Sequence, residues 1–519
     1  MRTGLRLIFC IFFCVSAVLL SAQRVLYSPF VGTRPATRFE VIGKTGSYYW
    51  IQKSKTKFTY HKTTEPWLND KDLSFEVYDE RMNLLKEIPS FLSPDLVKEY
   101  LVPGDDYFDQ LMLRPANDKI LALLDRYTPD GEQENHEDTV AEFPRSLKCG
   151  DFLLVRSQDK SKVLLLGFET VPDSPSVLHA FLFDRNWKLI CQADYANRNA
   201  SKPLVQYDLV EYPLEDFNSA SIKLSNDGEC VMILSSGFNH NYILAHFGSG
   251  GKDFFYKEIK LPPGAPVEDA GIYFDNVKQE GFAGILSRGR TTSVKNVRLV
   301  HYSLISFAID FDTSYAFSTL PANKGRDHNI YEEYFMTVPG KGFLFLKEYG
   351  RNFSPENDYD GSPDDGRQTE VAEGFVNRLV PPSFTKDEYS RYDNLAGTRS
   401  NFDRGDLALY YFPAKRNDTC WSGIISKEQV TELGTSYLSY VFVPRQDKLF
   451  FLYNSLYRTS SQFSSATVLD PKGNPISEGV EYWQIRNTLV FQKARQISEN
   501  ELAIPYERNM RNGFAIIRL

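Results

Sequence analysis

The chain has 519 residues, a formal net charge of −8 and 14% aromatic residues, including 30 tyrosines and 38 phenylalanines. The acidic balance excludes a typical nucleic-acid-binding protein, because such proteins need a basic stripe to meet the phosphates. Abundant aromatic residues, with Gly and Pro spread evenly, are typical of a β-rich protein with many short strands and turns.

The first 22 residues predict a secretory signal peptide. Arg2 and Arg6 give a basic start, residues 7–20 are almost wholly apolar, and Ser21-Ala22 supplies small residues for cleavage before Gln23. The apolar stretch is short for a membrane span, and no later segment reaches the necessary length. We therefore expect a soluble mature chain, residues 23–519, without a membrane span and either secreted or periplasmic. An uncleaved N-terminal anchor is the alternative.

From Phe39 to Glu507 one pattern recurs, in which two short apolar runs flank a polar turn. Eight such turns are rich in Gly, Asn, Asp, Pro or Lys: Gly43–Gly46, Arg114–Lys119, Arg156–Lys162, Ser225–Glu229, Asn276–Glu280, Pro339–Gly342, Pro444–Lys448 and Ser498–Asn500. A second hairpin often follows, and its first strand ends in an aspartate at Asp79, Asp184 and Asp470. Two such hairpins give four antiparallel strands, which is one propeller blade.

The repeat predicts an all-β fold, a single β-propeller of four-stranded antiparallel blades over residues 23–519. Eight blades is the first count, and seven is the alternative because the outer hairpin around His136–Phe143 is weak. Helical character is confined to a short stretch at Ser93–Tyr100. The last hairpin leaves the final blade one strand short. We expect Val25–Tyr27 to supply that strand and to close the ring, because closure removes two sheet edges.

The regular spacing of the turns is interrupted by a polar insert, residues 352–403. Within it, alternating carboxylates around a glycine resemble the first half of an EF-hand-type calcium loop: Glu356, Asp358, Asp360 and Asp364. Arg367 stands where such a loop ends in a bidentate glutamate, so the motif is incomplete. Calcium is the only cofactor that the sequence suggests, and a solvated loop without metal is the alternative.

Catalytic signatures are missing from the sequence, which has no G-x-S-x-G elbow, H-E-x-x-H motif or phosphate-binding P-loop. The seven histidines show no metal-ligand spacing, which predicts structural or surface roles. The cysteines beyond the leader are Cys149, Cys191, Cys230 and Cys420, with no zinc or redox spacing. We expect most of them to be buried as small hydrophobic residues, with a single disulfide as the alternative.

Three carboxylate pairs stand just before predicted inner hairpins, where propeller loops converge on one mouth of the ring: Asp105-Asp106, Glu268-Asp269 and Glu332-Glu333. Two acids about 5–10 Å apart can hydrolyse glycosides. The alternative is that each pair is the solvated end of a loop. Aromatic residues near these positions can stack on sugars, anchor a peptide or fill the core: Tyr107-Phe108, Tyr273-Phe274, Tyr334-Phe335 and Tyr437.

Residues 223–232, Lys-Leu-Ser-Asn-Asp-Gly-Glu-Cys-Val-Met, resemble the L-S-P-D-G-K-x-I turn of exported bacterial propellers related to that of the Tol-Pal assembly. Asn226 replaces the usual proline. The resemblance implies a propeller in an exported bacterial protein and transfers no activity, since such propellers bind, scaffold or catalyse.

Together these features favour a non-enzymatic propeller that binds a protein or glycan partner through its loop-rich face, including the insert. The main alternative is a glycan-acting hydrolase with carboxylates at the propeller mouth. A structural member of an envelope complex is a third reading.

Overall fold

The structure is a computed structural model, which describes these residues: 25–29, 37–55, 73–90, 95–169, 176–197, 221–235, 242–248, 254–259, 267–288, 294–318, 330–353, 401–414, 418–427, 429–431, 440–445, 447–456, 462–476, 482–483, 488–498, 500–508 and 511–519.

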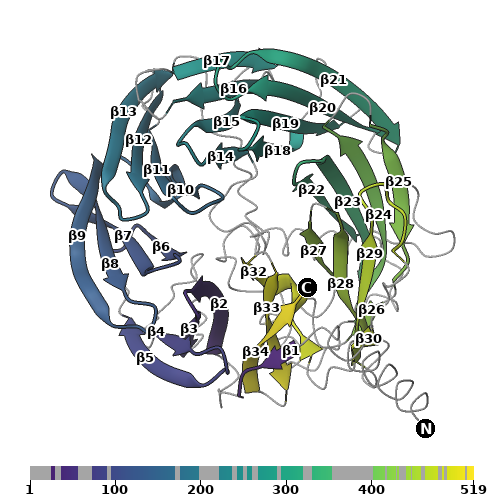
Figure 1. Cartoon of the computed structure of the whole chain (residues 1–519), viewed down its shortest axis with the longest axis horizontal. Coiled ribbons are helices and arrows are strands. Elements are labelled where there is room, and N and C mark those ends of the chain that lie inside the picture. Colours follow the sequence, from purple (N-terminus) through teal and green to yellow (C-terminus); the bar gives the residue numbers. More distant parts are fainter. Residues whose placement is uncertain are drawn as a thin grey trace, which may run out of the picture.

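The strands form a closed ring of eight antiparallel sheets around a central axis (Figure 1). This arrangement confirms the predicted all-β propeller and its count of eight blades. In blades 1 to 7, four strands that follow one another in the chain pair side by side from the axis outward.

Blades 1 to 4 contain, in this order, β2 (Thr37–Thr45), β3 (Tyr48–Lys55), β4 (Leu73–Tyr78) and β5 (Leu84–Ser90); β6 (Lys98–Pro103), β7 (Phe108–Ala116), β8 (Lys119–Tyr127) and β9 (Gln133–Pro144); β10 (Phe152–Arg156), β11 (Lys162–Glu169), β12 (Ser176–Asp184) and β13 (Leu189–Asn197); and β14 (Ile222–Leu224), β15 (Cys230–Ser235), β16 (Tyr242–Phe247) and β17 (Phe254–Ile259). A 3-10 turn, η1 (Cys149–Asp151), precedes blade 3.

Blades 5 to 7 contain β18 (Val267–Asp275), β19 (Glu280–Arg288), β20 (Val294–Ser303) and β21 (Ile309–Ser318); β22 (Ile330–Val338), β23 (Gly342–Phe353), β24 (Asn401–Pro413) and β25 (Trp421–Ile425), with β26 (Gln429–Thr431) also on β24; and β27 (Tyr440–Pro444), β28 (Leu449–Leu456), β29 (Gln462–Leu469) and β30 (Tyr482–Trp483).

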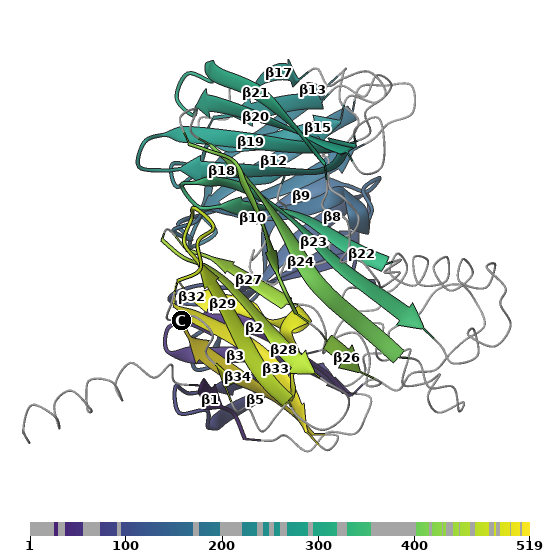
Figure 2. The same cartoon turned by 90° about the vertical axis from the view of Figure 1, so that its right-hand side faces the viewer.

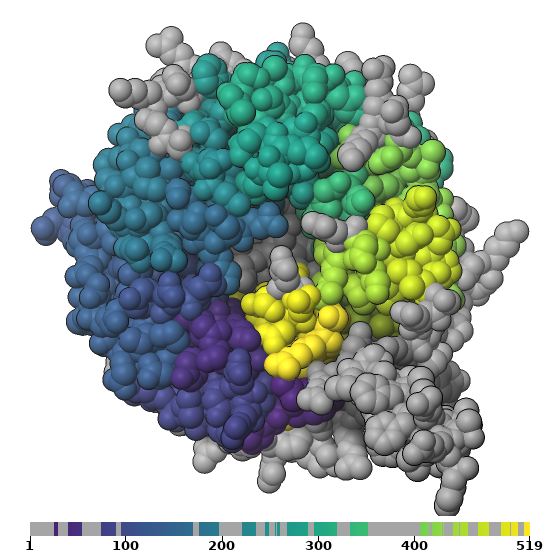
Figure 3. Space-filling model, in the orientation of Figure 1, coloured from purple at the N-terminus to yellow at the C-terminus, as the bar shows by residue number. Residues whose placement is uncertain are grey.

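Blade 8 joins the two ends of the described chain, and Figure 3 shows purple N-terminal residues beside yellow C-terminal ones. Its inner strand is split into β31 (Thr488–Leu489), η4 (Phe491–Lys493) and β32 (Arg495–Ser498), followed by β33 (Glu501–Arg508) and β34 (Arg511–Arg518). The outermost strand is β1 (Val25–Tyr27), which pairs antiparallel with β34. The Tyr506 hydroxyl donates to the Ser28 carbonyl at 2.5 Å, just beyond the strand. The predicted closure of the ring is confirmed.

The hydrophobic core is divided into eight clusters, one between each pair of adjacent blades. A strand inside a blade therefore presents apolar side chains to both neighbouring blades, which explains the run Val163–Leu166 on β11 that is buried without alternation. A blade cannot cover its own faces, so the whole ring is the unit that excludes water.

The two faces of the ring differ. Turns that join first to second strands meet on one face: Lys160 Nζ in blade 3 lies 3.1 Å from Asp105 in blade 2, and the Asn226 amide in blade 4 donates to Asn276 in blade 5. We call this the turn face. The opposite, insert face is where β23 ends and β24 begins. Figure 2 shows β23 and β24 extending past the other blades on that side.

The predicted turn chemistry is confirmed in the outer hairpins. Asp79 Oδ1 accepts hydrogen bonds from the backbone N–H groups of Arg81 and Asn83, at 2.9 and 2.8 Å. Asp184 and Asp470 bind the same two positions downstream of themselves. These bonds lower the pKa of Asp79, chiefly through Asn83. An aspartate at this place therefore fixes a tight reversal.

Blade 2 departs from the prediction. Lys98–Tyr100, expected to be helical, begin the inner strand β6, and the turn within Arg114–Lys119 joins the second strand to the third. The charged residues Lys98 and Glu99 made this segment look unlike a strand. They are tolerated on its half-buried surface because both hydrogen-bond to neighbouring strands. The stretch around His136–Phe143 belongs to the outermost strand, β9.

The prediction for the cysteines is wrong in part. Only Cys230 is buried, whereas Cys191 is half-buried and Cys149 and Cys420 are exposed. All four thiols are free. The two exposed ones stand in connections between strands, outside the packed blade faces. Within the described ranges, no helix has the length and hydrophobicity needed to cross a bilayer.

Candidate functional site

The candidate site begins with a β-bulge in β18. The register between β18 and β19 shifts between Val267 and Asp269, so Glu268 is an extra residue in the inner strand of blade 5. Alternation along a regular strand sends neighbouring side chains to opposite faces, and a bulge breaks that rule. Glu268 reaches Lys295, which in turn contacts blade 6, while Asp269 Oδ2 accepts from the Phe335 amide of blade 6 at 3.2 Å.

Five charged side chains meet at this junction and form what we call the charge cluster: Glu268, Arg288, Lys295, Glu333 and Lys347. Lys295 Nζ lies 2.6 Å from Glu268 and 2.8 Å from Glu333, and its side chain is only 3% exposed. Arg288 Nε donates to Glu268 at 2.9 Å. One buried ammonium therefore joins the carboxylates of two adjacent inner strands, β18 and β22.

Burial and ion pairing act differently on the two lysines. Burial alone would lower the pKa of Lys295, but hydrogen bonds to Glu268 and Glu333 outweigh it and raise the pKa above its ordinary value. Burial lowers the pKa of Lys347, and repulsion from Lys295 adds to this against the attraction of Glu333, which is 3.4 Å away. Lys295 is a firmly charged bridge, and Lys347 is the less stably protonated of the two.

The predicted carboxylate pairs do not all share one mouth. Glu268 and Glu333 converge, as expected, but Asp105 and Asp106 lie in the β6–β7 turn on the opposite face. There Asp106 lies 3.4 Å from Arg185 of blade 3. The expectation that Asp105 and Asp106 lie at the same mouth is wrong, because the sequence pattern placed the inner hairpin of blade 2 at β7–β8, and the structure has it at β6–β7.

Most of the predicted stacking rings belong to the core. Phe108, Phe274 and Phe335 are buried, and Phe108 stacks on Trp50 with ring centroids 3.9 Å apart. Tyr107 is covered by the guanidinium of Arg126, 4.4 Å from its centroid. Burial raises the pKa of Tyr273. Tyr437 lies outside the described residues.

Four histidines are described, and each contacts a carboxylate. His179, His246 and His301 occupy the third strands of three successive blades, and His179 and His246 each lie 2.8 Å from an acid, Asp194 and Glu229 respectively. His136 on β9 contacts Asp125 at 3.1 Å. Structural or surface roles for these four histidines stay a prediction. His61, His240 and His328 lie outside the described residues.

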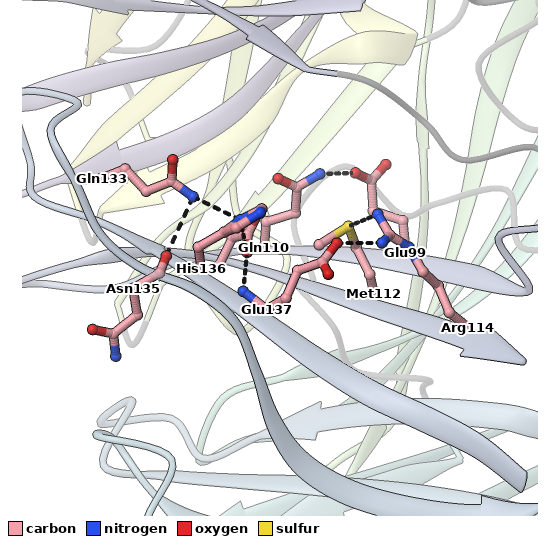
Figure 4. A network of polar contacts seen from close by, with 9 residues as sticks. Glu99, Gln110, Met112, Arg114, Gln133, Asn135, His136 and Glu137 are labelled. Carbon is pink, nitrogen blue, oxygen red and sulfur yellow. Dashed lines mark hydrogen bonds and ion pairs between the residues drawn. The ribbon is translucent and has the colours of Figure 1, made fainter. Parts of the chain in front are cut away.

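His136 belongs to a polar network on blade 2 (Figure 4). The Glu137 amide donates to Asp125 at 2.7 Å, and the Glu137 side chain pairs with Arg114. Glu137 has a φ of 53°, and the β8–β9 register shifts three times in this stretch. Bulges and charges on an outermost strand discourage pairing with another chain.

A buried ion pair lies at the base of the insert. Lys427 Nζ contacts Glu348 and lies 2.6 Å from Gln429 Oε1. Gln429 donates to the Asn454 carbonyl in blade 7 at 2.6 Å, and the Asn454 amide donates to Leu489 in blade 8 at 2.8 Å. This chain of bonds ties three blades together beside the strands that carry the insert.

The residues proposed for calcium, Glu356, Asp358, Asp360 and Asp364, lie outside the described residues. Among the residues that are described, no group of three or more histidine, cysteine or acidic side chains is placed to hold a metal ion. Lys295, Lys347 and Arg288 were missed at the sequence level, because only the bulge at Glu268 and the packing of blades 5 and 6 bring them together.

No protein-family model matches the chain, and no curated protein matches it. Among solved structures, the chain is similar to a lignostilbene dioxygenase of Pseudomonas brassicacearum at 10% identity and a TM-score of 0.37, over 90% of this chain and 93% of that one. It is similar to the Dos1 propeller at 8% identity and a TM-score of 0.31, over 81% and 91%.

A further similarity is to the β-propeller domain of the Trilobed protease from Pyrococcus furiosus, at 9% identity and a TM-score of 0.31, over 80% of this chain and 95% of that domain. Similarities at this level carry no argument about activity, ligand or partner. The site itself has to supply that argument.

Proposed function

We propose that the protein is an exported, non-enzymatic β-propeller that binds a protein or glycan partner through the loops of its insert face. The charge cluster is the observation that carries this proposal. Both carboxylates that converge there accept from one buried ammonium, which holds the surface rigid and leaves neither acid arranged as a proton donor. Polar groups that ion pairs hold in place suit recognition, because little order is lost on binding.

The position of the insert supports the same proposal. The strands β23 and β24 that carry it extend past the other blades (Figure 2), and the bonds from Lys427 to Leu489 secure their base. Long insertions on a rigid scaffold are frequent places of recognition.

The test replaces residues 354–400 with a short Gly/Ser linker in the mature chain. We expect an unchanged circular-dichroism spectrum and melting temperature, together with weaker capture of partners from the producing cells and from a glycan array. Capture equal to that of the intact chain would remove the insert from the proposal.

Glycan hydrolysis is the second candidate, and the convergence of Glu268 and Glu333 favours it. A screen of the mature chain against polysaccharides and aryl glycosides separates the two functions. Turnover that disappears in Glu268→Gln or Glu333→Gln would establish the hydrolase. Glu142→Gln is a suitable control, because Glu142 forms an exposed ion pair with Lys119 on blade 2.

Export and calcium binding complete the proposal. The basic and apolar leader and the resemblance of residues 223–232 to Tol-Pal-type propellers support export. Sequencing the N-terminus of the secreted chain tests export, and we expect it to begin at Gln23.

Calorimetric titration of the mature chain with calcium, compared with the Asp358→Asn/Asp360→Asn variant, tests calcium binding by the insert. A pull-down from a membrane fraction tests membership of an envelope complex.

A further inference from the structure

We propose that the turn face of blade 5 is a second docking surface, built for a protein partner that has an apolar pocket with a basic rim. The proposal rests on the function as a binding scaffold and adds a surface on the face opposite the insert. Four observations carry it: two projecting aliphatic side chains, the bond between their turns, the rigidity of the surrounding turns and the sign of the neighbouring charges.

Val277 and Ile305 are the most exposed large hydrophobic residues among those described, at 94% and 81%. Val277 lies in the β18–β19 turn and Ile305 in the β20–β21 turn, both on the turn face. The two turns are bonded, because the Leu304 amide donates to the Gln279 carbonyl at 2.9 Å. A single exposed aliphatic residue is ordinary, whereas two on joined turns form an apolar projection.

The turns around this projection are held in place by side-chain amides. Gln279 Nε2 donates to Asp227 at 2.7 Å, Asn276 accepts from the Asn226 amide at 2.9 Å, and Asn276 Nδ2 donates to Gln158 at 3.3 Å. These bonds link the inner turns of blades 3, 4 and 5. A surface that is ordered before binding loses less entropy when a partner docks.

The chemistry of the surface favours a protein over a glycan. Valine and isoleucine offer no flat ring for a sugar, whereas apolar pockets in proteins accept them. The acids nearby are Asp227, which accepts from Gln279, and Glu280 and Asp310, which both contact His301, while the neighbouring cation Lys278 is bonded to Asp275 at 2.7 Å. An acidic rim matches a basic one and accelerates encounter at low salt.

The first experiment places the photo-crosslinker benzoylphenylalanine at Val277 in the full chain, made in its producing cells. The matched control carries it at Ile424, an aliphatic residue 51% exposed on β25 of blade 6. We expect one protein to be crosslinked from residue 277 and not from residue 424. No crosslinked protein from residue 277, or the same product from both positions, overturns the proposal.

The second experiment purifies that protein and measures its affinity by calorimetry. Val277→Ser/Ile305→Ser should raise Kd at least about tenfold, as hot-spot truncations do, and Ile424→Ser should change Kd by less than about twofold. Both variants alter exposed side chains only, so folding is unaffected. Affinity should fall with added salt. An equal Kd for the double variant and the wild type overturns the proposal.

The two proposals fail in distinguishable ways. If the purified partner binds, loses affinity on replacement of residues 354–400 and ignores Val277→Ser/Ile305→Ser, the insert face alone is the docking surface. If the Val277 variant crosslinks no protein and the insert replacement loses no partner, the binding function itself falls.

Discussion

The blade 2–3 junction and the blade 5–6 junction both bury a cation beside carboxylates, and they use it in different ways. In the first, Arg126 grips Asp109 with two bonds of 2.8 and 3.1 Å, and the Trp187 indole donates to the same carboxylate at 2.8 Å. Tyr107 lies against the guanidinium. One cation, one anion and two rings close that junction completely.

The blade 5–6 junction is more open. Its ion pairs involve Lys295, Lys347 and Arg288 against two carboxylates, and Arg288 is 50% exposed. A bulge aims Glu268 into this junction. The comparison teaches that a buried ion pair alone does not mark a functional site. Access to water and the number of charges distinguish the candidate site from the structural ion pair, because three cations face two carboxylates there, whereas Arg126 and Asp109 form a single buried pair.

The largest loss of stability is expected at the Arg126–Asp109 ion pair of the blade 2–3 junction. Arg126→Met leaves the carboxylate of Asp109 buried without its cation, which costs about 3–5 kcal/mol of unfolding free energy. Urea unfolding of the mature chain measures it. Arg126→Lys, which keeps the charge and loses the two-pronged contact, should cost less. A loss in Arg126→Met below about 1 kcal/mol would mean that this junction tolerates an open charge.

Lys295→Met should cost about 1–3 kcal/mol, because Arg288 and Lys347 remain and Glu268 and Glu333 partly reach water. The same urea titration checks this, with Lys347→Met as the control of smaller effect. If Lys295→Met is as damaging as Arg126→Met, the contrast between a closed and an open junction is wrong.

Two glycines test whether the difference is confined to the charges. A Cβ at Gly167 would lie 2.9 Å from Phe143 in the blade 2–3 junction, and a Cβ at Gly284 would lie 2.9 Å from Phe335 in the blade 5–6 junction. Gly167→Ala and Gly284→Ala should each cost about 1–3 kcal/mol through overpacking. Equal shifts in melting temperature would support similar apolar packing. A clearly smaller shift for Gly284→Ala would mean that the apolar side chains of the blade 5–6 junction are also packed less tightly.

Alkaline pH should affect the stabilising contributions of Lys295 and Arg126 differently. The pKa of Lys295 is raised from 10.5, so its contribution to stability is complete below that pH and is lost as the pH rises through the raised value. Against the effect of burial, the hydrogen bonds and charge of Asp109 raise the pKa of Arg126 above its ordinary value, and its contribution persists over this range. Melting temperatures from about pH 8 to about pH 12 should fall less in Lys295→Met than in the wild type. Parallel curves for the two would contradict this.

The smallest effect is expected at the rim of the cluster. Arg288→Ala removes a half-exposed ion pair and should change stability by less than about 1 kcal/mol. Its influence should appear instead in partner affinity, measured with the same preparation. A large loss of stability would place Arg288 among the structural residues.

The fold was predictable wherever local chemistry decided it. The Asn, Asp and Gly residues of Ser225–Glu229 need a tight turn, and the structure has one there, with Gly228 at a φ of 92°. The missing strand of blade 8 was predictable because an uncovered edge is unfavourable, and Val25–Tyr27 had the apolar pattern to cover it.

The candidate site was predictable only in part. The acids Glu268 and Glu333 were recognised, since the ends of inner strands meet at one face. Lys295 was not, because it comes from the third strand of its blade and reaches the acids only through the packing of two sheets. The bulge at Glu268 has no local signal either, since no glycine marks it. The inner strand of blade 2 was mispredicted for a related reason, because Lys98 donates to the Phe152 carbonyl of blade 3, a contact that the local sequence does not reveal.

The seam of the ring gives the order of synthesis a physical meaning. Val25, Leu26 and Tyr27 are synthesised long before their partners Ile517, Ile516 and Ala515. Until those partners emerge, the edge strand has nowhere to pair, and contacts between such distant segments are the slowest to form. The time that the growing chain spends with this sheet uncovered is therefore set by the length of the whole ring, and the exposed strand needs protection until residues 515–517 have been made.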